Sequence, residues 1–412
     1  MPVHNSLDLV WPSEGLTRIP YPVYGRADVY DEERARLFMG ATWNFLCLEA
    51  ELPQPGDYRA TFVGDVPVVV ARDLDGSLGA FENRCAHRGA LLCLKSGGHG
   101  AEISCVYHNW TYDLKGKLTG VAFQRGIKRK GGMPADFKLA EHNIRTLRVA
   151  SFAGIVFGTF SADTPPVEAY LGPEIARRIQ RVMHKPIKLL GYNNQLLPNN
   201  WKLYVENVKD SYHASLLHLF FTTFRLNRLS QEGGIIVDES GGHHVSYSKM
   251  ASDQQSAEYD SATLRAKRED YRLADPSMLA GRDEFGDGVS LQILSVFPAF
   301  IVQQIQNCLA VRQVVPRGVG ETELVWTYFG YADDDEEMLR MRLKQANLVG
   351  PGGYVSMEDG AVGGFIQRAL PGGAADCSVI EMGGREATSQ DTRATESSVR
   401  GFWKAYRAHM GL

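Results

Sequence analysis

The sequence is poor in cysteine, in long apolar runs and in net charge, and each scarcity excludes a class of protein. Only six cysteines occur in 412 residues, too few and too scattered for a disulfide-stabilised secreted scaffold. No stretch approaches the roughly 18 uninterrupted apolar residues that a membrane-spanning helix needs. The net charge is −4, so we expect neither a nucleic acid nor a membrane as a partner.

Two further signals are missing. The first residues, MPVHNSLDLVWPSEG, have neither a basic start nor an apolar run. They therefore predict no secretory signal, and we expect a cytoplasmic protein. No GxGxxG motif stands at a strand–helix junction, so any nicotinamide or flavin chemistry is expected in another polypeptide.

The patterning along the chain predicts two kinds of fold. Short alternating or apolar segments, punctuated by Gly, Asp-Gly and Pro, fill residues 41–160 and predict an all-β domain. Residues 1–40 and 161–412 combine helical spacing with segments typical of antiparallel strands. We therefore expect an α+β protein, in which the all-β domain is inserted into a larger domain of an antiparallel sheet flanked by helices.

Four residues of the all-β block have the composition of a metal-cluster site. The segment CAHRG places Cys85 two residues before His87, and CVYHNW places Cys105 three residues before His108. Two thiolates and two imidazoles are the ligands of a Rieske [2Fe–2S] cluster, in which the cysteines hold one iron and the histidines the other. A structural zinc site is the alternative, although zinc fingers usually pair cysteine with cysteine and histidine with histidine. The pattern favours the Rieske cluster.

A second pair of histidines follows in ENVKDSYHASLLH. His213 and His218 are five residues apart, so their side chains converge only if the helix breaks or bends between them. Two imidazoles and one carboxylate form the ligand set of non-haem Fe(II) oxygenases. Either histidine taken alone is more simply a buried core residue, but the cluster motif upstream favours iron.

Spacing alone does not identify the carboxylate of this second site. Acids occur at residues 333–337 and again at Glu358 and Asp359. The first group opens a charged helical segment, where acids suit the helix N-terminus and stay solvated. The second lies between YVSM and GAVGGFIQRAL, apolar surroundings in which a charge needs a partner.

Together the motifs resemble the α subunit of Rieske non-haem iron ring-hydroxylating oxygenases. The resemblance rests on the two Cys/His pairs and on Asn-x-x-Asp-x-Tyr-His-x4-His at residues 207–218. It extends over nearly the whole chain, through DESGGHHVSYS, VSMEDGAVGGFIQR and ATESSVRGFWKAYRAHM. The spacing from Asn207 to Asp210 resembles that of the benzoate and anthranilate branch.

The resemblance implies roles for three acids. Asp359, the second acid of its pair, would be the third iron ligand, with Glu358 as the alternative. Asp210 would lie between an iron histidine of one subunit and a cluster histidine of the next and would carry electrons between them; capping of a helical turn is the alternative. Because the two metals of one subunit lie far apart in this family, such a path implies a head-to-tail trimer.

The resemblance also implies a reaction and partners. The chain would be the large subunit of a terminal oxygenase, assembled with a small β subunit as α3β3. Electrons from NAD(P)H would arrive through a separate reductase, and both atoms of O2 would add to an aromatic carboxylate, giving a cis-dihydrodiol. Terephthalate is the expected substrate. The alternatives are a salicylate-, anthranilate- or benzoate-type hydroxylase, a monooxygenase of the same architecture, and a Rieske electron carrier.

Three polar residues are candidates to bind the carboxylates of such a substrate. A dicarboxylate in an apolar pocket needs a cation at each end, and a guanidinium meets a carboxylate with two parallel hydrogen bonds. Arg312 stands in the apolar segment NCLAVRQVVP, and Arg393 precedes the last helical segment. Ser246, in HHVSYS, would add a neutral hydrogen bond. The alternatives place Arg312 at a solvated edge and Arg393 on the surface.

Overall fold

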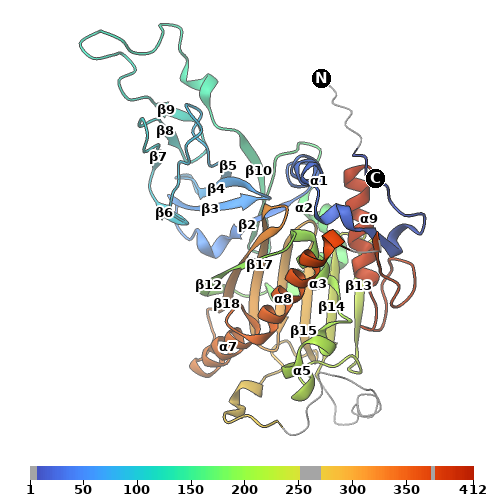
Figure 1. Cartoon of the computed structure of the whole chain (residues 1–412). Helices are drawn as coiled ribbons and strands as arrows, with labels where there is room; N and C mark the ends of the chain where they lie inside the picture. Colours follow the sequence, from blue (N-terminus) through green and yellow to red (C-terminus); the bar gives the residue numbers. More distant parts are fainter. Residues whose placement is uncertain (1–6, 251–270, 373–375) are drawn as a thin grey trace. The chain divides into compact units, whose positions relative to one another are not determined.

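The computed structural model describes residues 7–250, 271–372 and 376–412, and the chain divides into two compact units (Figure 1). Residues 38–170 form the small unit. The large unit comprises the chain up to Leu37 and residues 171–412. The small unit is thus an insertion into the large one.

The small unit is built on an antiparallel sheet with the strand order β2-β11-β10-β5-β4-β3-β6. These strands are β2 (Asn44–Leu48), β3 (Asp57–Val63), β4 (Val66–Arg72), β5 (Leu78–Glu82), β6 (Gly97–His99), β10 (Thr146–Phe152) and β11 (Ile155–Thr159). The turn between β3 and β4 requires glycine at Gly64, which has φ +58°; a Cβ there would lie 2.6 Å from the Phe38 ring.

A second, three-stranded sheet of the small unit carries one of the two predicted cluster loops, and the other follows β5 of the larger sheet. Its strands are β7 (Glu102–Ser104), β8 (Thr111–Asp113) and β9 (Leu118–Gly120). One cluster loop follows β5 and the other joins β7 to β8. Trp110 and Tyr112 lie beside the second loop and are buried, at 4% and 0% exposed, so they anchor that loop to the core of the unit.

The large unit has a seven-stranded antiparallel sheet with the order β12-β18-β17-β16-β15-β14-β13. The strands are β12 (Ile187–Leu197), β13 (Gly233–Val237), β14 (His244–Lys249), β15 (Val289–Val296), β16 (Phe300–Ile305), β17 (Cys308–Gly318) and β18 (Glu321–Tyr331). All residues of β16 are buried, which shows that both faces of the sheet are covered at its centre. A short pair of strands, β1 (Arg18–Pro20) and β19 (Cys377–Val379), ties the N-terminal segment to the C-terminal part.

Helices flank this sheet (Figure 1). They are α1 (Ala27–Glu33), α2 (Val167–Val182), α3 (Trp201–Lys209), α4 (Ala214–Leu217), α5 (Leu219–Thr223), α7 (Glu336–Val349), α8 (Tyr354–Ala369) and α9 (Ser397–Met410). Helix α3 packs on β15 and β17 and also on α8 and α9. No helix among the described residues is long and apolar enough to cross a membrane. The α+β class with an inserted all-β unit, predicted from the sequence, is confirmed.

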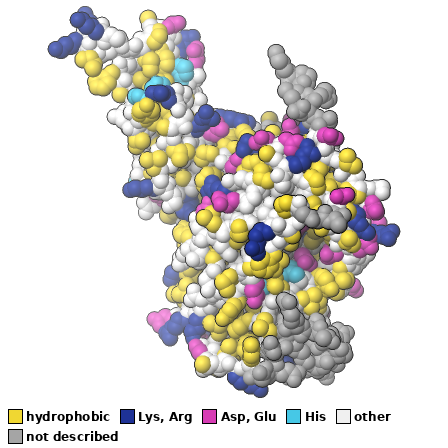
Figure 2. Space-filling model, in the orientation of Figure 1, with side chains coloured by type: hydrophobic (Ala, Val, Ile, Leu, Met, Phe, Trp, Pro, Cys, Tyr) yellow, Lys and Arg dark blue, Asp and Glu magenta, His cyan; other side chains and the backbone are white. Residues whose placement is uncertain are grey.

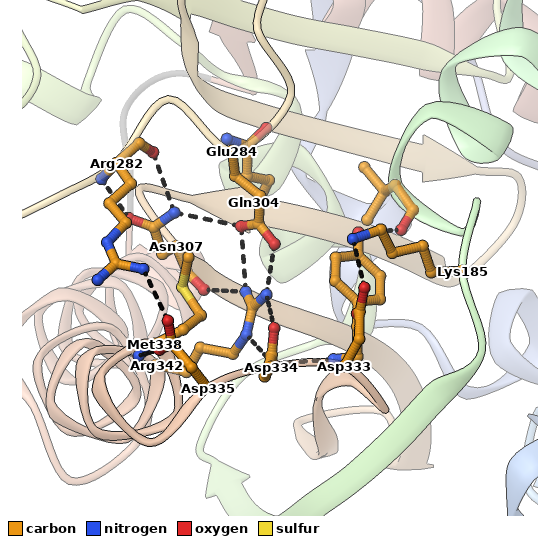
Figure 3. A network of polar contacts seen from close by, with 12 residues as sticks. Lys185, Arg282, Glu284, Gln304, Asn307, Asp333, Asp334, Asp335, Met338 and Arg342 are labelled. Atoms are coloured by element: carbon orange, nitrogen blue, oxygen red, sulfur yellow. Dashed lines mark hydrogen bonds and ion pairs between the residues drawn. The ribbon is translucent and has the colours of Figure 1, made fainter.

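A buried ion-pair network fixes α7 to the turn between β16 and β17 (Figure 3). Arg342 on α7 donates to the Asp334 carboxylate at 2.7 Å and to the Asn307 carbonyl at 2.7 Å, and it also pairs with Glu284. The Arg342 side chain is 1% exposed. The charge is therefore compensated by two carboxylates, as burial demands.

Candidate metal centres and substrate cavity

The two cluster loops repeat one backbone arrangement around a buried cysteine. The Cys85 N–H donates to a carbonyl five residues later at 2.8 Å, and the Gly89 N–H donates back to the Cys85 carbonyl at 2.9 Å. The same two bonds recur around Cys105, where Asn109 takes the place of Gly89. Both Gly89 and Asn109 have positive φ, +74° and +51°, which glycine and asparagine tolerate best.

The two loops place the imidazoles of His87 and His108 beside each other, and each loop buries one thiol in the core of the small unit. Cys85 and Cys105 are each 2% exposed, whereas the rings of His87 and His108 are exposed and their centroids lie 4.6 Å apart. The His87 ring stacks on Trp110 at 4.8 Å. Desolvation and the neighbouring His108 lower the pKa of His87, which favours the neutral imidazole that a metal requires. The donor set fits a [2Fe–2S] cluster.

Tyr112 is a residue of this site that the sequence reasoning missed. Its hydroxyl oxygen accepts a hydrogen bond from the Ala86 N–H at 3.1 Å and lies 3.4 Å from Cys85 Sγ. Burial raises the pKa of Tyr112, so the hydroxyl keeps its proton and can donate it to the sulfur. Hydrogen bonds to the sulfurs are among the factors that set cluster potentials.

Helix α3 ends at Lys209, just before the segment that carries His213 and His218. The Asp210 carboxylate accepts the Tyr212 N–H at 2.8 Å, a local bond that competes with helix continuation. A second break occurs at His218, whose φ and ψ are −81° and 86°. The helical turn α4 fills the interval between the two histidines, so the second break falls at His218 itself and not between them; with the earlier break at Asp210 it brings His213 and His218 together with Asp359.

The three residues offer ligand atoms that all lie within 4.8 Å of one another. Nε2 of His213 lies 3.4 Å from Asp359 Oδ1, and Nε2 of His218 lies 3.3 Å from the same oxygen. Asp359, on α8, is 8% exposed. Two imidazole nitrogens aimed at one buried carboxylate oxygen fit a shared divalent cation of the 2-His-1-carboxylate type.

The electrostatics of this group favour a cation. Burial disfavours the charged form of each group, but the attraction between the imidazoles and the carboxylates is stronger. It lowers the pKa of Asp359 and raises the pKa of His213 to about 10. A site that attracts protons so strongly will also attract a metal ion, and the metal must displace those protons when it binds.

Each imidazole has a carboxylate on its other nitrogen. Glu358 Oε2 lies 2.7 Å from Nδ1 of His218, and Asp210 Oδ2 lies 3.3 Å from Nδ1 of His213. The Glu358 contact is a hydrogen bond, which fixes the orientation of the His218 ring and raises its basicity as a ligand; the Asp210 contact has an ion-pair distance without hydrogen-bond geometry. Glu358, considered from the sequence only as an alternative ligand, therefore lies on the outer side of His218. The other acidic group is elsewhere: Asp335 caps α7 and accepts the Met338 N–H at 2.7 Å.

One cavity joins the histidine and carboxylate group to the three predicted substrate residues. Its lining includes His213, His218 and Asp359 together with Ser246, Arg312 and Arg393. Much of the remaining wall is apolar, formed by Phe221, Leu291, Ile293, Ile305, Val349 and Val355. An apolar cavity with a few polar groups is the usual form of a small-molecule site.

Arg312 faces this cavity from β17. It is 5% exposed, donates to the Tyr204 hydroxyl at 2.8 Å and lies over the Trp326 ring at 4.8 Å. In the described ranges no carboxylate forms an ion pair with Arg312. Arg393 is 2% exposed, so it is not a surface residue, and its guanidinium donates to the Asn227 side chain and to a backbone carbonyl.

Comparison with known proteins agrees with this architecture. Residues 42–130 match the model of the Rieske [2Fe-2S] domain, and residues 174–412 match that of the ring hydroxylating alpha subunit (catalytic domain). The chain is 59% identical to the terephthalate 1,2-dioxygenase terminal oxygenase component subunit alpha 2 of Comamonas sp., over 97% of each chain. It is 47% identical to the anthranilate 1,2-dioxygenase large subunit of Burkholderia cepacia, over 99% of this chain and 96% of that one.

The fold has counterparts among solved structures. Naphthalene 1,2-dioxygenase from Rhodococcus sp. superposes with a TM-score of 0.78 at 22% identity, covering 95% of this chain and 94% of that one. The match includes both the inserted all-β unit and the larger sheet. With the two family matches and the two close relatives, these findings show that the chain belongs to the α subunits of ring-hydroxylating oxygenases, which carry a Rieske [2Fe–2S] cluster and a mononuclear iron.

Proposed function

We propose that this chain is the large subunit of a terminal oxygenase that converts terephthalate to a cis-dihydrodiol dicarboxylate. The observation that carries the proposal is the single cavity in which two buried arginines, Arg312 and Arg393, lie with the histidine and carboxylate group. Two buried cations suit a substrate with a carboxylate at each end. The relatives that act on terephthalate and on anthranilate support an aromatic carboxylate.

We assign the metal ligands as the sequence predicted them. The cluster ligands are Cys85, His87, Cys105 and His108, and the iron ligands are His213, His218 and Asp359. The division into a Rieske domain at 41–160 and a catalytic domain at 1–40 and 161–412 stays a prediction. Ferrous iron, when bound, supplies the activation of dioxygen.

The side chains of the cavity bind and orient the substrate. Arg312 and Arg393 hold its carboxylates, with Ser246 as an additional hydrogen-bond donor, and the apolar wall excludes water from the ring. Because both guanidinium groups are buried and held by their own partners, they fix the position of the ring relative to the iron ligands. Holding the ring in a fixed position relative to the iron ligands lowers the entropic cost of the reaction.

A second cavity supports the role proposed for Asp210 between subunits. It is lined by Asp210 and His213 and also by Glu206, Ile380 and Glu396. Asp210 thus lines two cavities, and one of them does not contain the substrate arginines. The Asp210 carboxylate can therefore be approached from outside the substrate cavity. A neighbouring subunit needs such an approach if one of its cluster histidines is to reach this carboxylate.

The surface around the cluster also suits docking. Figure 2 shows histidines at the surface of the small unit among hydrophobic and basic side chains. Near the two cluster loops, Leu91, Leu94, Val106 and Tyr107 are 44%, 66%, 68% and 55% exposed. Contiguous exposed apolar side chains mark interaction sites. We propose that this surface docks on a second copy of the chain in a head-to-tail trimer.

The remaining partners follow from the family. We propose a small β subunit, giving α3β3, and a separate reductase that delivers electrons from NAD(P)H to the cluster. O2 and the aromatic dicarboxylate are the substrates. All six cysteines are free, which agrees with the cytoplasm as the compartment.

The test is turnover of terephthalate by the large subunit with its β subunit, a reductase, NADH and labelled dioxygen. Mass spectrometry should find two labelled oxygen atoms in a cis-dihydrodiol. One labelled atom would identify a monooxygenase. Conversion of salicylate, anthranilate or benzoate without conversion of terephthalate would overturn the assignment of terephthalate as the substrate. An iron content of about two per chain, all of it in the cluster, would identify an electron carrier.

A further inference from the structure

The cavity contains one buried polar side chain that the roles assigned so far do not explain. Gln303 on β16 is 1% exposed and lines the cavity. Neither its amide nitrogen nor its amide oxygen has a hydrogen-bond partner within the described part of the chain. Burying an amide without a partner is costly. A partner from outside the chain is therefore expected.

The strand register places Gln303 next to Arg312. Gln303 pairs with Ala310 of β17, and Arg312 lies two residues further along β17 on the same face. Diagonal neighbours of this kind are about 7–8 Å apart, so two long side chains can reach one small group. The adjacent Gln304 faces the other way and is satisfied, because it accepts from Arg181 at 2.7 Å and donates to a backbone carbonyl at 2.9 Å.

Two further N–H groups at this position also lack partners. Trp326 stands directly opposite Arg312 in the β17–β18 pair and lines the same cavity. In the described ranges, neither Trp326 Nε1 nor Arg312 Nε has a hydrogen-bond partner, although both atoms are buried. With the Gln303 amide nitrogen, three neighbouring residues offer unused donors. Clustered donors and one positive charge suit a planar anion that accepts several hydrogen bonds, and a carboxylate is such an anion.

We propose that Gln303, Arg312 and Trp326 form a binding subsite for one carboxylate of the substrate, in which Gln303 determines specificity. The inference rests on the proposed function, since it requires an aromatic carboxylate as substrate. Arg312 supplies the charge, and the Gln303 amide nitrogen donates to one carboxylate oxygen. That bond fixes the rotation of the carboxylate and, because the carboxylate is conjugated with the ring, the tilt of the ring plane towards the iron ligands.

The substitution Gln303→Leu removes both polar atoms at similar volume. Loss of a hydrogen bond to a charged group should raise the KM for terephthalate by roughly ten- to a hundredfold. Gln303→Glu, which places a second negative charge beside the carboxylate, should raise KM further. Trp326→Phe should raise it by a smaller factor. In all three variants the iron content and the cluster spectrum should match the wild type.

Gln292→Leu is the matched control. Gln292 lies on the neighbouring strand β15, is 0% exposed and also has an amide oxygen without a partner in the described residues. It faces away from the cavity, and its amide nitrogen donates to the Arg178 carbonyl at 3.1 Å. The same substitution there should leave KM and the product unchanged.

The outcomes separate the inference from the proposed function. If the wild-type enzyme converts only a monocarboxylate, terephthalate is refuted as the substrate. The Gln303 variants are then assayed with that monocarboxylate. Unchanged KM and unchanged product in Gln303→Leu, with iron retained, would show that a buried water satisfies this amide and would overturn the inference. If Gln303→Leu does not retain iron, Gln303→Met is measured in its place, because methionine keeps the unbranched shape of glutamine. An unchanged KM and product in that variant, with iron retained, would overturn the inference.

Discussion

Replacement of Arg312 by alanine tests the substrate class most directly. The side chain is 5% exposed, and no acid in the described part of the chain pairs with it. A dicarboxylate bound in the cavity therefore has this guanidinium as its counter-charge at one end. Without it, one carboxylate would be buried unpaired, at a cost of about 3–5 kcal/mol. That cost corresponds to a loss of roughly two to four powers of ten in kcat/KM.

The assay compares terephthalate with benzoate, which lacks the second carboxylate. If benzoate uses the Arg393 end, Arg312→Ala should reduce kcat/KM for terephthalate much more than for benzoate. Discrimination between the two substrates should therefore relax. Arg312→Lys is the control, because it keeps the charge but loses the two-pronged geometry and should recover only part of the activity. Wild-type kcat/KM for terephthalate in an iron-loaded Arg312→Ala enzyme would refute the reasoning.

Three further predictions concern the metal site and the fold. Asp359→Ala should lose the mononuclear iron and turnover while the cluster EPR signal stays normal. Full turnover of this variant would make the assignment of Asp359 as a ligand wrong. Glu358→Gln should weaken iron binding by only about 10–100-fold. Asp210→Ala should retain substantial iron. In a single turnover with substrate and O2, its reduced cluster should stay reduced. Normal reoxidation of the cluster would contradict the role of Asp210 in electron transfer between subunits. Glu284→Ala removes one of the two carboxylates around buried Arg342 while Asp334 still pairs with it. The variant should therefore lower the free energy of unfolding by about 1.5–3 kcal/mol in denaturant titration, and an unchanged midpoint would show that this network contributes little.

The grouping of the candidate metal ligands could be predicted because it is local. The Cys/His pairs occupy tight loops, so their spacing in the sequence indicates which side chains lie together. The five-residue interval from His213 to His218 required a broken or bent helix, and the chain leaves the helical conformation at His218, directly after α4. Tyr112 was missed because its role depends on a turn that brings its hydroxyl beside a cysteine from another loop.

The lining of the cavity was less accessible to sequence reasoning. Strands β16 and β17 are buried on both faces over most of their length, so the alternation of polar and apolar residues that reveals a solvated face is absent. Gln303 and Gln304 are adjacent in the sequence, yet only the first faces the cavity. The choice between Glu358 and Asp359 likewise depended on which carboxylate α8 turns towards the histidines.

The candidate metal ligands and substrate contacts come from different layers of the large unit. The candidate iron ligands lie at the two ends of α4 and on α8, whereas Ser246, Gln303 and Arg312 project from β14, β16 and β17. A mutation on the strand face can therefore reshape the substrate cavity while the backbone ladder and the iron ligands stay in place. Such mutations are a route by which ring-hydroxylating enzymes diverge in substrate, because the enzyme still holds its iron after each step. Directed evolution towards new aromatic acids should accordingly sample strand positions first and leave the helical layer unchanged.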